Sequence, residues 1–136
     1  MTQPMLRALF YIGALYDGIL GVAFMFVPAS VFAGFNVTPP NHWGYVQFPA
    51  GLLVVFALMY AAVARHPQRN RNLIPYGILL KVCYCGVVFG YWFTSGIPGM
   101  WKPFAIADLI FAALFWWAYA STAPDERESA APPGAR

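Results

Sequence analysis

The sequence has 136 residues, of which 60% are hydrophobic and only 10% are charged. Soluble domains carry about a quarter charged residues, so this composition excludes an ordinary water-soluble surface. The net charge of +3 does not indicate nucleic-acid binding, because the basic residues form no stripe and lie beside apolar segments. We therefore expect an integral membrane protein that binds lipid and no nucleic acid.

Four segments are long and apolar enough to cross a hydrocarbon core of roughly 30 Å, which takes about 20 helical residues. Pro28 and Pro67 follow two of these segments, and Gly96 and Pro98 predict a turn before the last one. Pro49 falls in the first turns of the second segment, where a missing N–H is harmless. The fold class predicted is all-α, an integral membrane four-helix bundle with helices at about 5–27, 45–64, 73–93 and 103–120.

The helices form one predicted domain, residues 1–121, followed by a polar Ala/Pro-rich tail, residues 122–136, that we expect to be disordered. Residues 31–33 resemble a signal-peptide processing site after the first helix. Because that apolar stretch exceeds the usual ~7–15 residue core of a signal peptide and contains Asp17, we expect it to remain as a span.

Basic residues in the connections predict the orientation of the bundle. Positive residues gather on the cytoplasmic side of membrane proteins, and here Lys102 stands alone on one side. The other side carries Arg7, Arg65, Arg69, Arg71, Arg127 and Arg136. We expect both termini to lie in the cytoplasm and the protein to be a multi-pass component of a bacterial inner membrane.

Three ionisable residues lie inside the apolar segments: Asp17, Lys81 and Asp108. Each costs about 2.5 to 3.5 kcal/mol at the centre of a span, so all three should face the bundle interior. At about 1.5 Å per residue, Asp17 lies roughly 18 Å and Lys81 roughly 12 Å from the start of its helix, a difference that a lysine stem spans. We expect Asp17 and Lys81 to be the primary pair and Asp108 to lie nearer the outer surface.

Two acids and one base leave an uncompensated negative charge if all are ionised, which a low-dielectric interior disfavours. One aspartate is therefore expected to be protonated: Asp108 if it is dry, or Asp17 if Lys81 prefers Asp108. Hydrogen bonds from Tyr16, Tyr84 or Gln47, the other candidate members of this polar cluster, could stabilise either arrangement. The sequence leaves open a structural ion pair that fixes helix register and a pocket for a ligand or proton.

Small residues spaced by three and four on the first helix, including Gly13, Gly18 and Gly21, predict close approach of another helix. The cysteines Cys83 and Cys85 project to nearly opposite faces of one helix, which excludes a mutual disulfide. His42 and His66 fall on opposite sides of the membrane. We therefore predict no metal site and identify no cofactor.

The segments YIGALYDGILG, PNHWGYVQFPAGLL, RNLIPYGILLK and SGIPGMWKPFAIADL resemble the DoxX-like family of small bacterial membrane proteins. The resemblance implies a four-helix bundle and a setting in quinone-linked sulfur oxidation or oxidative-stress complexes. It transfers no catalytic residue.

No catalytic motif is visible, so a non-enzymatic bundle is favoured over an enzyme. Our leading hypothesis is that its polar interior binds a lipid-like or quinone-like molecule or supports a partner membrane protein or a second copy of the chain. The alternatives are a small proton-coupled carrier and a membrane subunit of a redox enzyme complex.

Overall fold

The computed structural model describes residues 1–123, which form an all-helical chain with four helices long and apolar enough to span a membrane. The prediction of four spans is confirmed. Their bounds, close to those expected, are α1 (Gln3–Phe26), α3 (Gly44–Arg65), α4 (Ile74–Phe93) and α5 (Trp101–Ser121). Most of the predicted tail, residues 124–136, lies outside the described residues.

Two short helices were not expected from the sequence. Pro28 ends α1, but it also begins α2 (Pro28–Gly34), because the first turn of a helix tolerates a residue without an N–H. Phe32 of α2 is buried and meets the rings of Phe24 and Trp43 edge to face. The 3-10 turn η1 (Arg71–Leu73) leads into α4.

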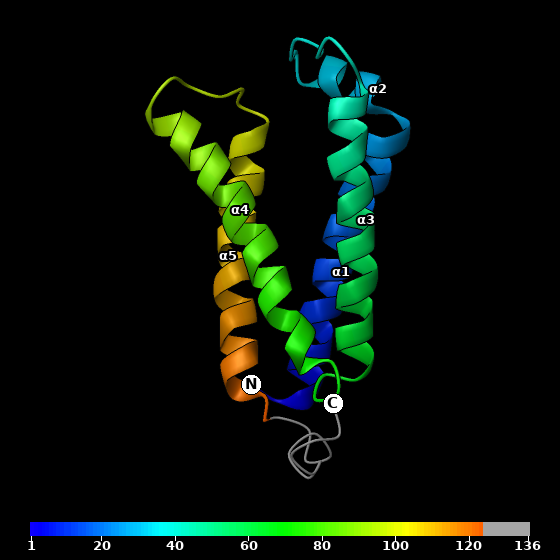
Figure 1. Cartoon of the computed structure of the whole chain (residues 1–136), viewed down its shortest axis with the longest axis vertical. Helices are drawn as coiled ribbons and strands as arrows, with labels where there is room; N and C mark the ends of the chain where they lie inside the picture. The colour runs from blue at the N-terminus through cyan, green and yellow to red at the C-terminus, as the bar shows by residue number, and fades with distance from the viewer. Residues whose placement is uncertain (124–136) are drawn as a thin grey trace, which may run out of the picture.

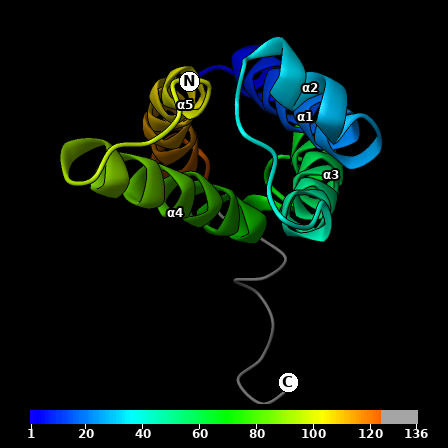
Figure 2. The same ribbon diagram turned by 90° about the horizontal axis from the view of Figure 1, so that it is seen from above.

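The four long helices are arranged as two pairs. Contacts are concentrated between α1 and α3 and between α4 and α5, and few join one pair to the other. Viewed along the bundle, the order around the axis is α1, α3, α4, α5 (Figure 2). The pairs converge where α1 begins and α5 ends, which we call the terminal end, and diverge toward the loop end, where α2 lies (Figure 1).

Small residues allow α1 to lie against α3, as the sequence predicted. A Cβ added at Gly21 would stand 2.8 Å from the backbone oxygen of Ala50, so the two backbones approach more closely than any side chain permits. One turn away, a Cβ at Gly18 would meet Ala57 at 3.5 Å, an ordinary contact. Gly21 is therefore the tightest point of this seam.

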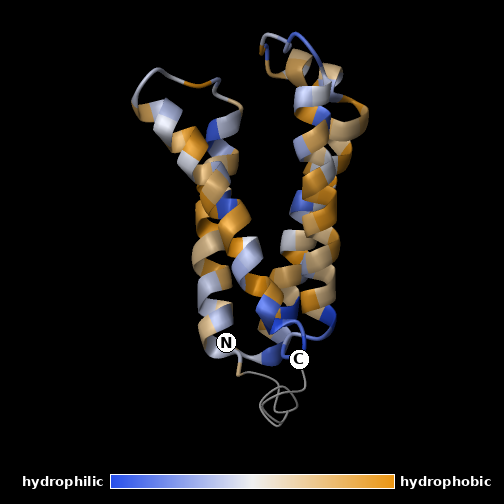
Figure 3. Cartoon of the chain, in the orientation of Figure 1, coloured by the Kyte–Doolittle hydropathy of each residue, from blue (hydrophilic) through white to orange (hydrophobic). Residues whose placement is uncertain are grey.

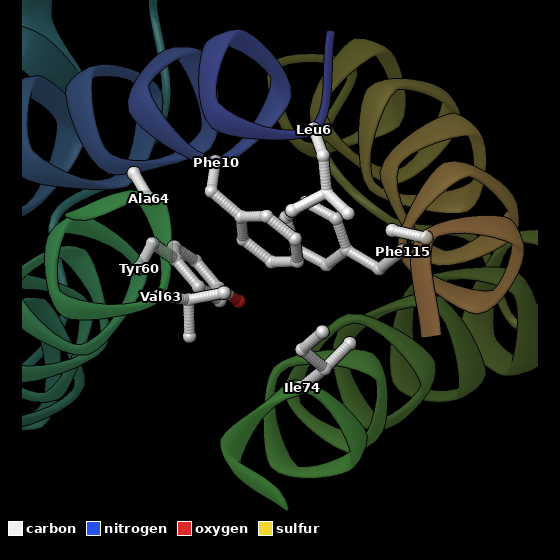
Figure 4. Close-up of a cluster of buried hydrophobic side chains, with 8 residues drawn as sticks. Leu6, Phe10, Tyr60, Val63, Ala64, Ile74 and Phe115 are labelled. Carbon is white, nitrogen blue, oxygen red and sulfur yellow. The ribbon is translucent and has the colours of Figure 1, made fainter. Parts of the chain in front are cut away.

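Buried side chains from all four long helices meet at the terminal end and point toward one another (Figure 4). The ring of Phe115 stacks on Phe10 with 4.6 Å between centroids and lies 5.0 Å from the ring of Tyr60. The Tyr60 hydroxyl donates to the carbonyl of Gly77 at 3.3 Å, which ties α3 to α4. We call this set the terminal cluster: Leu6, Phe10, Tyr60, Val63, Ala64, Ile74, Phe115 and Ala118.

Arg71 fastens the end of α5. Its guanidinium donates to the carbonyls of Thr122 at 2.6 Å and Tyr119 at 3.2 Å, and it lies over the Tyr119 ring. Thr122 is the cap residue of α5, and the carbonyls at this end lack the usual donor four residues on, although the Tyr119 carbonyl also accepts from the Thr122 N–H at 3.4 Å. Thr122, the first residue of the predicted tail, is buried under this contact.

The outer surface of the bundle is apolar. Ile19, Leu58 and Phe93 are each more than two-thirds exposed, and Figure 3 shows hydrophobic residues along the helices with hydrophilic ones mainly at the ends and at a few positions midway. Such a surface suits acyl chains rather than water. These are the features of a multi-pass membrane protein.

Candidate functional site

Lys81 of α4 lies between two carboxylates from other helices. Its Nζ donates a hydrogen bond to Oδ1 of Asp17 in α1 at 2.5 Å and lies 2.9 Å from Oδ1 of Asp108 in α5. All three residues are buried, with exposed fractions of 0%, 0% and 6% for Lys81, Asp17 and Asp108. We call them the ion cluster.

The structure brings the primary pair predicted from helix depth together. It also adds Asp108, which the sequence placed apart from this pair, since the residue is buried and shares the same ammonium. Asp108 lies about two turns inside α5, which begins at Trp101, and on the face of that helix that Lys81 of α4 contacts. The ammonium therefore joins three helices rather than two.

The ion cluster leaves several polar atoms without a hydrogen bond. Oδ2 of Asp17 and the Tyr16 hydroxyl are buried and have no partner, and Oδ1 of Asp108 contacts Lys81 outside hydrogen-bond geometry. The aromatic rings of Tyr16 and Phe111 lie 5.1 and 5.6 Å from the Lys81 Nζ. The cluster thus offers acceptors that nothing in the described chain satisfies.

A cavity of about 630 Å³ lies on the loop side of the ion cluster, and Asp17 and Asp108 both line it. Lys81 does not line it, so the carboxylates form its floor and the ammonium lies behind them. Its walls are almost entirely apolar and come from all four long helices and the turn before α5. They include Leu20, Phe24, Val46, Pro49, Ala50, Leu53, Leu80, Tyr84, Val88, Ile97, Trp101 and Phe104.

The mouth of the cavity faces the lipid between α3 and α4. Tyr45 of α3 and Val87 and Tyr91 of α4 line the cavity and are each more than half exposed. On the opposite side, Phe24 of α1 stacks on Trp101 of α5 with 5.6 Å between ring centroids. This stack spans the gap between α1 and α5, and the exposed lining residues of α3 and α4 mark an open side of the cavity between these two helices.

The other predicted cluster residues are distributed differently. Tyr16 and Tyr84 line the cavity, but neither makes the predicted hydrogen bond within the cluster, because the Tyr84 hydroxyl donates to the Trp101 carbonyl at 3.1 Å and the Tyr16 hydroxyl has no partner among the described residues. Gln47, however, is not part of the cluster, because its amide donates to the Met25 carbonyl at 3.0 Å. The last turn of a helix has carbonyls without intrahelical donors, and Gln47 binds one at the end of α1.

Pro49 also differs from expectation. It lies in the first turns of α3 as expected, but as the sixth residue it leaves the Tyr45 carbonyl without the helical N–H that would bind it, so the missing N–H is not without effect. Pro49 lines the cavity, as do Phe24 and Trp101, and none of the three carried a polar signal that marks a site in a sequence.

The histidines and cysteines take structural positions. The Nδ1 of His42 accepts from the Gly44 N–H at 3.0 Å at the loop end, and His66 follows α3 at the terminal end. Cys83 is exposed, whereas Cys85 is buried and its thiol donates to the Ala105 carbonyl at 3.3 Å. Within residues 1–123, His, Cys, Asp and Glu side chains form no group of three that could hold a metal ion.

The resemblance to DoxX-like proteins gains no support from other proteins and stays a prediction from the quoted segments. Comparison of the chain with models of known families, with curated proteins and with solved structures finds no match.

Proposed function

We propose that this protein is a non-enzymatic binding protein of a bacterial inner membrane, and that its cavity holds a lipid-like or quinone-like molecule. The observation that carries the proposal is the apolar cavity of about 630 Å³ with Asp17 and Asp108 at its floor. In the orientation that the basic residues favour, the terminal end faces the cytoplasm, and the cavity opens to the outer leaflet.

The size and lining of the cavity support this function. Small-molecule sites in proteins occupy about 300–1,000 Å³ and combine apolar walls with a few convergent polar groups. Here the walls suit an acyl or ring system, and the floor suits a polar head. A buried ion pair that only fixes the positions of the helices relative to one another needs no cavity beside it. The cavity therefore favours a ligand-binding role over a purely structural one.

The proposal is tested by filling the cavity. Leu53 lines it, whereas Val55, two residues along the same helix, faces outward and is 59% exposed. We expect Leu53→Trp to lose the small molecules that co-purify with the wild type in mild detergent, while Val55→Trp retains them. Mass spectrometry of organic extracts measures this, and identical extracts from both variants and from empty membranes would contradict the proposal.

A second candidate, a small proton-coupled carrier, is favoured by the different ends of the bundle. The cavity is open between α3 and α4 toward the loop end, and the terminal cluster closes the bundle below it. A carrier open to one side has this form, with Asp17 or Asp108 loading the proton. Proteoliposomes test it: flux driven by a pH gradient and abolished by Asp17→Asn supports a carrier, and absence of flux for amphiphilic solutes opposes it.

A further inference from the structure

The acidic side chains of the described chain are concentrated at one place. Residues 1–123 contain two acidic residues, Asp17 and Asp108, and although they come from α1 and α5, both contact Lys81 and line the same cavity. One ammonium therefore faces two carboxylates. An uncompensated charge in a low-dielectric interior is costly, and it is removed either by a proton on one aspartate or by one further positive charge at the floor of the cavity.

The unsatisfied atoms at this floor are mainly acceptors. Asp17 is fully buried, yet its Oδ2 has no hydrogen-bond donor, and Oδ1 of Asp108 has only the ion contact with Lys81. A buried acceptor without a donor costs stability. A ligand that brings N–H donors to this floor suits the two carboxylates, whereas one that brings only carbonyl acceptors does not.

The walls near the floor also suit a cation. Aromatic residues from all four long helices line the cavity, and Tyr16, Tyr84 and Phe104 lie within about one turn of the ion cluster along their helices. Aromatic rings attract ammonium groups through their negative faces, and the attraction grows where water is excluded. The one other lysine in the described chain, Lys102, lies over the Trp92 ring and does not line the cavity.

We infer that the occupant of the cavity is a cationic amphiphile, a molecule with a protonated amine attached to an apolar body. The inference rests on the proposed binding function and specifies the head group. The ligand ammonium donates to the carboxylate of Asp108, whose side chain keeps 8% exposure, and lies beside that of Asp17, so that two ammonium groups balance two carboxylates. The apolar body extends along the cavity toward the mouth between α3 and α4.

Matched probes test the head group. The protein is placed in phosphatidylcholine nanodiscs and titrated with pyrenemethylamine, pyrenemethanol and pyrenecarboxylate, which share one apolar body, and binding to empty nanodiscs is subtracted. We expect the amine to bind about tenfold more tightly than the alcohol, a modest gain for a desolvated cation, and the carboxylate most weakly.

The outcomes separate the two proposals. Equal binding of amine and alcohol overturns the cationic head group but leaves the binding function standing, and preference for the carboxylate does the same. If no probe binds above the empty nanodiscs, both proposals fail. The wild type alone decides this comparison, so it does not depend on any variant folding.

Two variants locate the preference. Asp108→Asn removes one carboxylate and leaves the hydrogen bond between Lys81 and Asp17, so the amine should lose its advantage over the alcohol. Lys102→Gln changes the charge of the loop end outside the cavity and should keep the advantage. If the preference survives Asp108→Asn, or if Lys102→Gln alone removes it, the ammonium does not bind at this floor.

A final arm identifies the source of the ammonium. Phosphatidylethanolamine carries a primary ammonium, so nanodiscs containing it compete with pyrenemethylamine if a lipid headgroup is the natural occupant. Weaker probe binding in these nanodiscs assigns the site to the headgroup, and unchanged binding assigns it to a free lipophilic amine. Both results support the ammonium site.

Discussion

The terminal and loop halves of the bundle are built from the same four helices but differ in how side chains fill the space between the helix pairs. In the terminal half, the rings of Phe10, Tyr60 and Phe115 occupy the space between the helix pairs. In the loop half, the pairs diverge around a cavity of about 630 Å³. Lys81 and its two carboxylates lie at the boundary between the halves, two turns beyond Phe10 along α1 and two turns before Phe115 along α5.

This difference shows how a small membrane bundle keeps a cavity open. Lipid tails are as apolar as the helix faces, so close packing and polar contacts, rather than hydrophobic burial, hold helices together in a bilayer. The terminal cluster and the ion cluster supply such contacts across the pairs. Beyond them, the Phe24 and Trp101 stack joins α1 to α5, and α3 and α4 are free to separate.

The largest effect is expected from removing the ammonium at the boundary. Lys81→Met leaves two buried carboxylates without a cation, and breaking a buried ion pair in this way costs about 3–5 kcal/mol. Unfolding by sodium dodecyl sulfate, followed by circular dichroism, measures the loss. The triple variant Lys81→Met, Asp17→Asn, Asp108→Asn should regain most of the stability, because it leaves no unpaired charge; a triple variant less stable than Lys81→Met would contradict this account.

A somewhat smaller effect is expected in the terminal half. Phe115→Ala removes a fully buried ring that stacks on Phe10, and we expect a loss of roughly 3 kcal/mol, the scale of such truncations. Phe104→Ala, in the same helix, removes a ring that lines the cavity and should cost much less, because fewer atoms pack against it. Equal losses in the same unfolding assay would show that the two halves are packed alike.

Two glycines of α1 that face α3 allow the packing within one helix pair to be compared at two positions. Gly21→Ala places a methyl group 2.8 Å from the Ala50 carbonyl oxygen, and overpacking of this kind costs about 1–3 kcal/mol. The control Gly18→Ala introduces a methyl at 3.5 Å from Ala57 and should leave the unfolding midpoint nearly unchanged. A stable Gly21→Ala protein would mean that the helices are farther apart than described.

The smallest effect is expected at the end of α5. Arg71→Gln removes the charged donor to the Thr122 and Tyr119 carbonyls, with a loss on the order of 1 kcal/mol for such hydrogen bonds. Amide hydrogen exchange should accelerate in the last turn of α5 and nowhere near the cavity. Arg69→Gln, at an exposed position of the same connection, is the control; if it has the same effect, the Arg71 contacts are not responsible.

The sequence predicted those features that depend on composition and on the cost of burying charge. Hydropathy located four spans, and the expense of an ionised group in lipid pointed to an interior pair of Asp17 with Lys81. Both arguments use properties of single residues or single helices, so they need no knowledge of how the helices cross.

Features that depend on how the helices cross and where they end could not be predicted from the sequence. The contact of Asp108 with Lys81 depends on how α5 packs against α4, and the binding of Gln47 to Met25 depends on the end of α1 lying beside the start of α3. The cavity arises because the two pairs diverge, and its lining residues are apolar residues indistinguishable in sequence from those that face lipid. The short helix α2 was missed because Pro28 both ends one helix and begins the next.

An electron-density map from crystals grown in a lipidic mesophase tests the central claim most directly, that the cavity above the ion cluster is a binding site. The account predicts elongated density between α3 and α4 that reaches the carboxylates of Asp17 and Asp108, with Lys81 within hydrogen-bond distance of Asp17. Helices α3 and α4 packed together along their whole length, with no space above the carboxylates, would contradict it.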